Sequence, residues 1–347
     1  MRVWKYARKW SVAGGRWSVA GGSCSSPSVS AGMVALPYGR AAATTSLRPP
    51  TTDHRPLFVA TLLLLMSTRV AAQAQLSVES DPALLTAGAP CVFRVKSSVP
   101  LQSLKGTWLE REVFFDYDRE SGKWYALAGT AIETSPGSHK LALEGLTLTG
   151  VKTSLREDLT VEKATHITIA LRVARKYTEP DAMTLERIHK EQALKQQVFA
   201  HKSPLRLWRG SFVVPLVSIV TEPFGTARTF NGAVQSVHQG LDYRAERGTP
   251  ISAMNSGTIL LARDLFFEGN IVVIDHGQGL LSLYLHLSEI GVKEGDQVER
   301  GQVVGKTGAT GRVTAPHLHV AVRWQGIYLD PARLLKLALP LGGASHN

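Results

Sequence analysis

From residue 76 onward the chain is a series of short apolar runs, and this pattern constrains the fold more than any other feature. Each run is rich in β-branched or aromatic residues and is bounded by Gly, Asp, Pro or Ser. The runs lie at 91–95, 113–117, 123–128, 140–143, 166–173, 271–274, 281–285, 302–304 and 318–322. No long amphipathic helical pattern interrupts the second half. The spacing therefore predicts an all-β protein.

The first five runs predict a β-sandwich-like domain over 75–175. They recur roughly every 8 to 12 residues or more, with turn pairs such as Ser121-Gly122 and Pro136-Gly137 between them, as in antiparallel sandwiches. The last run alternates, so that one face carries Ile167, Ile169, Leu171 and Val173. We therefore expect 166–173 to be a strand with one apolar face and one face that carries His166, Thr168 and Arg172.

A helical connector is predicted over 176–203, between two β-rich parts. Thr178 with Asp181 three residues later resembles a capping box, and Pro180 suits a first helical turn. The apolar positions are sparse, at Leu185, Ile188, Leu194 and Val198, so this segment does not form a core of its own. Strands resume after it, which predicts an antiparallel β-sheet domain over 204–340.

The positive charge is concentrated near the N-terminus and does not indicate nucleic-acid binding. The chain has 347 residues, enough for about two domains, and a net charge of +11. Residues 1–74 hold nine Lys or Arg against Asp53, a charge of +8 that leaves +3 for the rest. We expect no nucleic-acid partner, since such binding requires clustered cations. Two cysteines, Cys24 and Cys91, also exclude a disulfide framework.

The first 74 residues are predicted to be a leader that contains a signal peptide. Its h-region is 57–66, LFVATLLLLM, preceded by a basic residue and followed by Ala72-Gln73-Ala74. Ten residues are too few to span a bilayer core of about 30 Å. We expect cleavage before Gln75, export to the periplasm or medium, and no membrane span afterwards. Because some fifty residues precede the h-region, we expect translation to start nearer Met33 or later.

Histidine motifs in the second half predict a metal site. His238 and Asp242 are four residues apart, and His317 and His319 are two apart, which places both rings on one face of a strand. A further histidine, His286, lies in an apolar run. Catalytic zinc takes three N or O ligands and keeps one position open, whereas a structural zinc site usually has four Cys or His ligands. The motifs therefore favour a catalytic zinc.

Residues 224–335 resemble the lysostaphin/LytM-type zinc endopeptidases. The motifs that carry the resemblance are His238-x-x-x-Asp242, Tyr284-x-His286-Leu287 and Pro316-His317-Leu318-His319, with the glycine-containing segments 248–253, 257–259, 275–277 and 295–301. The β-rich region before the connector is similar to the N-terminal part of exported bacterial members. The resemblance implies an exported hydrolase that cleaves peptide cross-links of peptidoglycan.

The same resemblance implies a role for each histidine. His238, Asp242 and His319 would bind one Zn²⁺ per chain, while His286 and His317 would lie beside it as catalytic residues. They could orient the water, accept its proton and stabilise the oxyanion. The expected partners are the peptide stems of peptidoglycan. The alternative is a cell-wall regulator or amidase activator that uses this fold without catalysis of its own.

Three further residues are predicted to contact substrate. Arg228 and Asn231 lie in a loop before His238, where a solvated role is equally compatible with the sequence, and the Tyr284 hydroxyl could reach the cleft. His276 fits a hairpin turn instead. We also expect 76–173 to dock or restrain the enzyme and to be dispensable for hydrolysis of a small soluble peptide.

Overall fold

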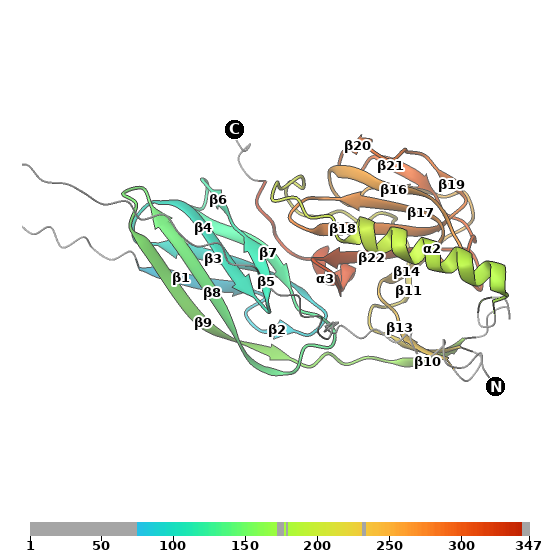
Figure 1. Ribbon diagram of the computed structural model, residues 1–347, viewed down its shortest axis with the longest axis horizontal. Helices are drawn as coiled ribbons and strands as arrows, with labels where there is room; N and C mark the ends of the chain where they lie inside the picture. Colours follow the sequence, from blue (N-terminus) through green and yellow to red (C-terminus); the bar gives the residue numbers. More distant parts are fainter. Residues whose placement is uncertain (1–74, 172–176, 178–179, 231–233, 342–347) are drawn as a thin grey trace, which may run out of the picture. The chain divides into compact units, whose positions relative to one another are not determined.

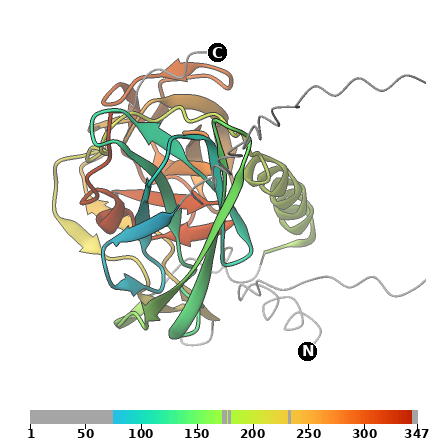
Figure 2. The same cartoon turned by 90° about the vertical axis from the view of Figure 1, so that its left-hand side faces the viewer.

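The structure is a computed structural model that describes residues 75–171, 177, 180–230 and 234–341 (Figures 1 and 2). All of these residues belong to one compact unit. The predicted leader, with its h-region at 57–66, lies outside them. Within the described part of the chain, no helix has the length and apolarity that crossing a membrane requires.

Two antiparallel sheets make up most of the N-terminal part. The four-stranded sheet has the order β1 (Leu76–Asp81), β3 (Pro90–Ser97), β7 (Lys123–Gly129) and β6 (Asp116–Asp118). The five-stranded sheet has the order β2 (Leu85–Thr86), β9 (Lys152–Glu162), β8 (Gly137–Thr147), β4 (Leu101–Trp108) and β5 (Arg111–Phe114), with only β2 parallel to its neighbour. The prediction of an all-β protein is confirmed.

Alternating side chains of these strands form a shared core. In β8, Leu141 and Leu143 are buried while Lys140 and Glu144 are exposed, as expected for a strand with one covered face. Trp108 is fully buried, and its ring meets Phe93 edge to face at 5.6 Å. Its indole N–H donates to the Gly129 carbonyl over 3.1 Å, so the ring is buried without losing its hydrogen bond.

An eight-stranded sheet dominates the C-terminal part. Its order is β11 (Val220–Glu222), β14 (Leu241–Arg244), β22 (His317–Trp324), β18 (Leu280–Leu287), β17 (Gly269–Asp275), β16 (Gly257–Leu265) and β20 (Gln297–Val298), with β23 (Ile327–Leu329) paired to β22. A three-stranded sheet has the order β15 (Pro250–Ser252), β21 (Val303–Lys306) and β19 (Glu289–Ile290). The short helix α3 (Pro331–Leu334) follows.

The middle strands of the large sheet are apolar throughout because both faces are covered. In β17, Val272 and Ile274 belong to one buried cluster, whereas Ile271 and Val273 belong to another. The second cluster is covered partly by Leu194, Val198 and Phe199 of helix α2 (Ala182–Phe199), which lies beside the sheet in both views (Figures 1 and 2). Strands covered on both sides lose the polar–apolar alternation of half-exposed strands.

Helix α2 begins later than the sequence pattern predicts. Its N-cap is Asp181, whose carboxylate accepts from the Thr184 N–H over 2.7 Å, and Thr178, for which a capping box is predicted, lies outside the described residues. The helix is tied to the large sheet by an Arg187–Asp264 ion pair of 2.7 Å and a Lys195–Glu268 ion pair. The connector is therefore packed on the C-terminal part rather than fully solvated.

The strand predicted at the end of the N-terminal domain pairs elsewhere. β10 (Thr168–Leu171) lies parallel to β12 (Ala227–Phe230), which pairs antiparallel with β13 (Val234–Val237). These three strands form a separate sheet, so 168–171 contributes to the C-terminal part although its sequence continues from the sandwich. A strand's partners are tertiary contacts, and its alternation alone does not identify them.

A buried histidine, His276, is held in the neutral form by the core. Its Nδ1–H donates to the Ser256 carbonyl, and its Nε2 lies 2.8 Å from the Ser282 hydroxyl. That hydroxyl is 3.0 Å from the Tyr284 hydroxyl, which in turn accepts from the Met254 N–H. Burial lowers the pKa of His276 to about 4.

His276 should make the fold sensitive to mild acid. Because its pKa is about 4 in the folded protein and about 6.5 when unfolded, its contribution is complete above pH 6.5 and is lost as the pH falls towards 4. The free energy of unfolding should fall by about 3 kcal/mol between pH 6.5 and pH 4 through this histidine. We expect His276→Gln to lower stability at pH 7 but to flatten this pH dependence, measured as urea midpoints between pH 7 and 4. His189→Gln, at an exposed position of α2, is the control; equal slopes for all three proteins would contradict the prediction.

Candidate metal and catalytic site

The pairing of β14 with β22 positions the site. Asp242 lies directly opposite His319, and Arg244 lies opposite His317. His317 and His319 are two residues apart and share a face of β22, while Leu318 between them is fully buried on the other face. The sheet thus presents one carboxylate and two imidazoles side by side.

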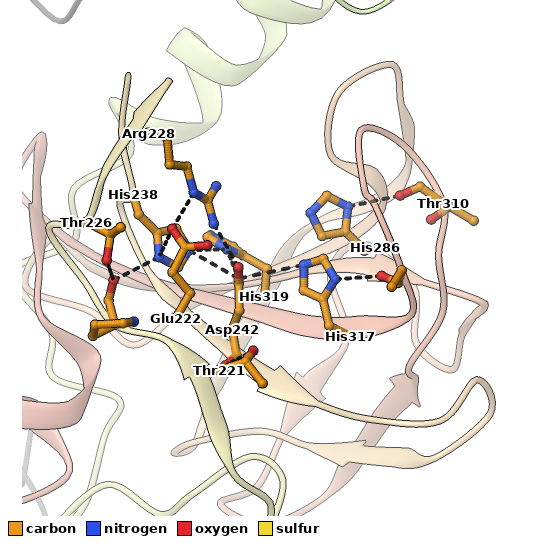
Figure 3. A network of polar contacts seen from close by, with 12 residues as sticks. Thr221, Glu222, Thr226, Arg228, His238, Asp242, His286, Thr310, His317 and His319 are labelled. Atoms are coloured by element: carbon orange, nitrogen blue, oxygen red, sulfur yellow. Dashed lines mark hydrogen bonds and ion pairs between the residues drawn. The ribbon is translucent and has the colours of Figure 1, made fainter. Parts of the chain in front are cut away.

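Three residues form a cluster that could hold a metal ion. Their potential ligand atoms, one each from His238, Asp242 and His319, all lie within 4.8 Å of one another (Figure 3). The Asp242 Oδ1 atom is 3.1 Å from His238 Nε2 and 2.7 Å from His319 Nδ1, and these two nitrogens are 3.0 Å apart. The structure therefore brings together the three residues predicted as metal ligands.

The backbone around His238 orients its ring for metal binding. The Nδ1–H donates to the Pro223 carbonyl over 2.9 Å, so the lone pair of Nε2 faces Asp242 and His319. A hydrogen bond from the outer nitrogen of an imidazole is the usual way to select the ligating tautomer. Gly240 is required nearby, since a Cβ there would overlap the Val320 carbonyl oxygen and the His319 ring.

The protonation states of the cluster also suit a metal. Burial alone would raise the pKa of Asp242, but hydrogen bonds and charge from His238 and His319 hold it well below its usual range. Burial lowers the pKa of His319 to about 4 against the opposing effect of Asp242. A carboxylate and a neutral imidazole are the forms that bind metal ions, so the donor set fits one at neutral pH.

Arg228 contacts the carboxylate of Asp242, a candidate metal ligand. Its Nη2 lies 2.7 Å from Asp242 Oδ2, and its Nε lies 2.5 Å from Glu222 Oε1 (Figure 3). The sequence predicted a substrate contact for Arg228 and did not single out Glu222, which stands before Pro223 with no motif around it. Asn231, the neighbouring candidate, lies outside the described residues.

Two further histidines border the cluster and have the same tautomer. The Nδ1–H of His286 donates to the Thr310 carbonyl over 2.9 Å, and that of His317 donates to the Ala315 carbonyl over 2.8 Å. Their ring centroids are 5.0 Å apart, and His317 Nε2 is 3.7 Å from Asp242 Oδ1 (Figure 3). Each therefore keeps an Nε2 lone pair that can accept a proton near the cluster.

His286 is the more constrained of the two. It is 7% exposed, and its φ of 64° lies in the left-handed region that few residues other than glycine adopt. Burial, followed by the charges of His319 and His317, holds the pKa of His286 well below its ordinary value. Backbone strain of this kind is found where the surroundings force a side chain into a functional position.

Tyr284 is a core residue, which corrects the prediction that it contacts substrate. Its ring is fully buried, and its hydroxyl belongs to the Met254–Ser282–His276 chain rather than to the cluster. Burial raises its pKa to about 12. The motif Tyr-x-His predicts that Tyr284 and His286 share a face, which holds only for a regular strand. The β17–β18 register shifts between Asn270 and Val272, opposite these two residues, so the strand is irregular there.

Comparisons with known proteins agree with this geometry. The family model described as Peptidase family M23 matches residues 236–331. The chain is 40% identical over 107 residues to peptidoglycan DD-endopeptidase ShyA of Vibrio cholerae, covering 31% of this chain and 24% of ShyA. It is 38% identical over 134 residues to DD-carboxypeptidase/endopeptidase Mpg of Neisseria meningitidis, covering 38% and 30%. It thus spans less than a third of either relative.

A solved structure covers more of the chain. A Pseudomonas aeruginosa protein described as a peptidase M23 is 31% identical, and the match covers 72% of this chain and 94% of that one with a TM-score of 0.55. The segment matched by the family model contains all five residues described above, namely His238, Asp242, His286, His317 and His319. On these grounds, the chain belongs to peptidase family M23.

Proposed function

We propose that this protein is an exported zinc metallo-endopeptidase that hydrolyses peptide cross-links of bacterial peptidoglycan. One observation carries the proposal: a buried cluster of His238, Asp242 and His319 bordered by two histidines whose Nδ1–H groups donate to backbone carbonyls, so that each keeps an Nε2 lone pair. The substrate class is supported by the names of ShyA and Mpg, which are peptidoglycan DD-endopeptidase and DD-carboxypeptidase/endopeptidase.

Zinc is the metal that this donor set favours. Two imidazole nitrogens and one carboxylate oxygen are typical ligands of a catalytic zinc, with one coordination position left open. One ion per chain would be held by His238, Asp242 and His319. Bound there, zinc supplies Lewis acidity, which activates water and polarises a carbonyl group near neutral pH.

His317 and His286 would move the protons. His317 is partly exposed, with 18% of its side chain accessible, so its Nε2 can meet both a water molecule and a peptide. His286 is buried deeper, and its neutral imidazole can accept a proton or, once protonated, donate to a developing oxyanion. Anchoring both rings through Nδ1 fixes their direction before substrate arrives.

Export and substrate access complete the proposal. The apolar segment 57–66 would direct the chain across the membrane, and the peptide stems of peptidoglycan would be the partner. The alternative is a regulator that activates a separate cell-wall amidase without catalysis of its own. A complete set of five cluster residues argues against it, since a non-catalytic protein does not need both proton-transfer groups.

A zinc assay should distinguish the proposed metal ligand His238 from the flanking histidine His317. We expect His238→Ala to lose the metal, because it removes a ligand, whereas His317→Ala should keep most of its zinc. His189→Ala is the control for a histidine outside the cluster. Zinc content per chain, measured by elemental analysis after exhaustive dialysis, tests this. Full occupancy in His238→Ala, or none in His317→Ala, would reverse the assignment.

The same variants test catalysis. Purified zinc-loaded protein should release cross-linked fragments from peptidoglycan, as read by mass analysis of the products. His317→Ala should be slower by about 10²- to 10⁴-fold, the usual contribution of a general acid–base or oxyanion group. His319→Ala should be inactive. If the zinc-loaded protein leaves cross-links intact but binds an amidase, and His319→Ala retains its effect in cells, the regulator is the correct function.

A further inference from the structure

Asp242 engages two groups with its two oxygens. Oδ1 faces His238 and His319, at 3.1 and 2.7 Å, whereas Oδ2 accepts a hydrogen bond from Arg228 at 2.7 Å. Only 9% of the Asp242 side chain and 17% of the Arg228 side chain are exposed. A carboxylate can bind a metal through one oxygen or both, and a charged hydrogen bond to Oδ2 favours the first mode.

Arg228 is itself held by a second acid. Glu222 Oε1 accepts from Arg228 Nε over 2.5 Å, so the guanidinium lies between two carboxylates through two different nitrogens. The same Glu222 oxygen is 3.5 Å from His238 Nδ1. This arrangement uses the planar fork of arginine, which a lysine cannot reproduce. Glu222 therefore fixes the direction in which the Arg228 guanidinium points, and the charge of that group attracts Asp242.

The strand that carries Arg228 is supported by β10, which follows the N-terminal sandwich in the chain. β12 is the middle strand of its three-stranded sheet, with β13 on one side and β10 on the other, and Ile169 of β10 is the register partner of Arg228. The Ala227 N–H donates to the Ile167 carbonyl over 2.8 Å just before it. β10 reaches this sheet from the end of the N-terminal sandwich, so a segment distant in sequence supports the Arg228 backbone.

We propose that Arg228 is a positioning residue that restricts Asp242 to a single metal-facing oxygen, and that strand β10 holds Arg228 in place by pairing with β12. Metal affinity then depends on whether β10 is paired with β12. This inference rests on the proposed zinc site. It also implies that a chain starting near Pro204 binds zinc more weakly, contrary to the expectation that 76–173 is dispensable.

The test is a zinc-affinity cycle on the full exported chain. Zinc dissociation constants, from competition with a chromophoric chelator, are compared for the wild type, Arg228→Gln, Ile169→Pro and the double variant. Arg228→Gln should weaken binding by about 10- to 100-fold, the usual effect of losing an outer-shell partner. Ile169→Pro removes an N–H from the centre of β10 and should weaken binding to a lesser extent. In the Arg228→Gln background it should add nothing.

Two control variants distinguish a positioning role of Arg228 from a general loss of folding. Lys163→Pro places the same change at an exposed position between β9 and β10, outside both strands, and should bind zinc normally. Arg228→Lys keeps the charge but should still alter the visible spectrum of the Co²⁺-substituted protein, which reports ligand geometry. Wild-type affinity and spectrum in Arg228→Gln would overturn the positioning role, and additive losses would overturn the role of β10. A wild type that binds no zinc would instead remove the proposed function and this inference with it.

Discussion

The register between β14 and β22 is the constraint on which the site depends. Because Asp242 is paired with His319, a slip of one residue would place the carboxylate opposite Leu318 or Val320 and turn it towards the core. The register is protected by burial, since Leu318 and Val320 are fully buried and would themselves become exposed. The apolar core behind the sheet therefore fixes the positions of Asp242 and His319 on its other face.

Much of the site could be predicted because its periodicity is local. His317 and His319 lie two apart on one strand, so their shared face follows from strand geometry alone. Glu222 could not be found this way: its contact with Arg228 depends on the turn at Pro223–Thr226, where the Thr226 hydroxyl donates to the Pro223 carbonyl. The position of Tyr284 could not be predicted either, because the spacing of Tyr284 and His286 gives a shared face only in a regular strand, and the pairing here is irregular.

The fold shows the same division between local pattern and tertiary pairing. Short apolar runs predicted an all-β chain, and β17 and β18 lie where such runs occur. Strands with weaker apolar patterns, such as β4 and β9, were not predicted, since their stability comes from long pairings with β8. β10 was recognised as a strand, but the alternation that reveals it is compatible with either sheet.

The loop before β22 orients the rings of His286 and His317 through its backbone carbonyls. Thr310 and Ala315 offer backbone carbonyls that hold the Nδ1–H of His286 and His317, so the path of this loop determines which nitrogen of each ring faces the cluster. Between them, the Gly311 carbonyl accepts from the hydroxyl of Tyr177. Tyr177 and β10 both lie before α2 in the chain. Tyr177 contacts the loop that holds His286 and His317, whereas β10 pairs with the strand that carries Arg228. Since carbonyl positions depend on backbone path rather than side-chain identity, the Tyr177 contact helps to fix the loop that orients His286 and His317.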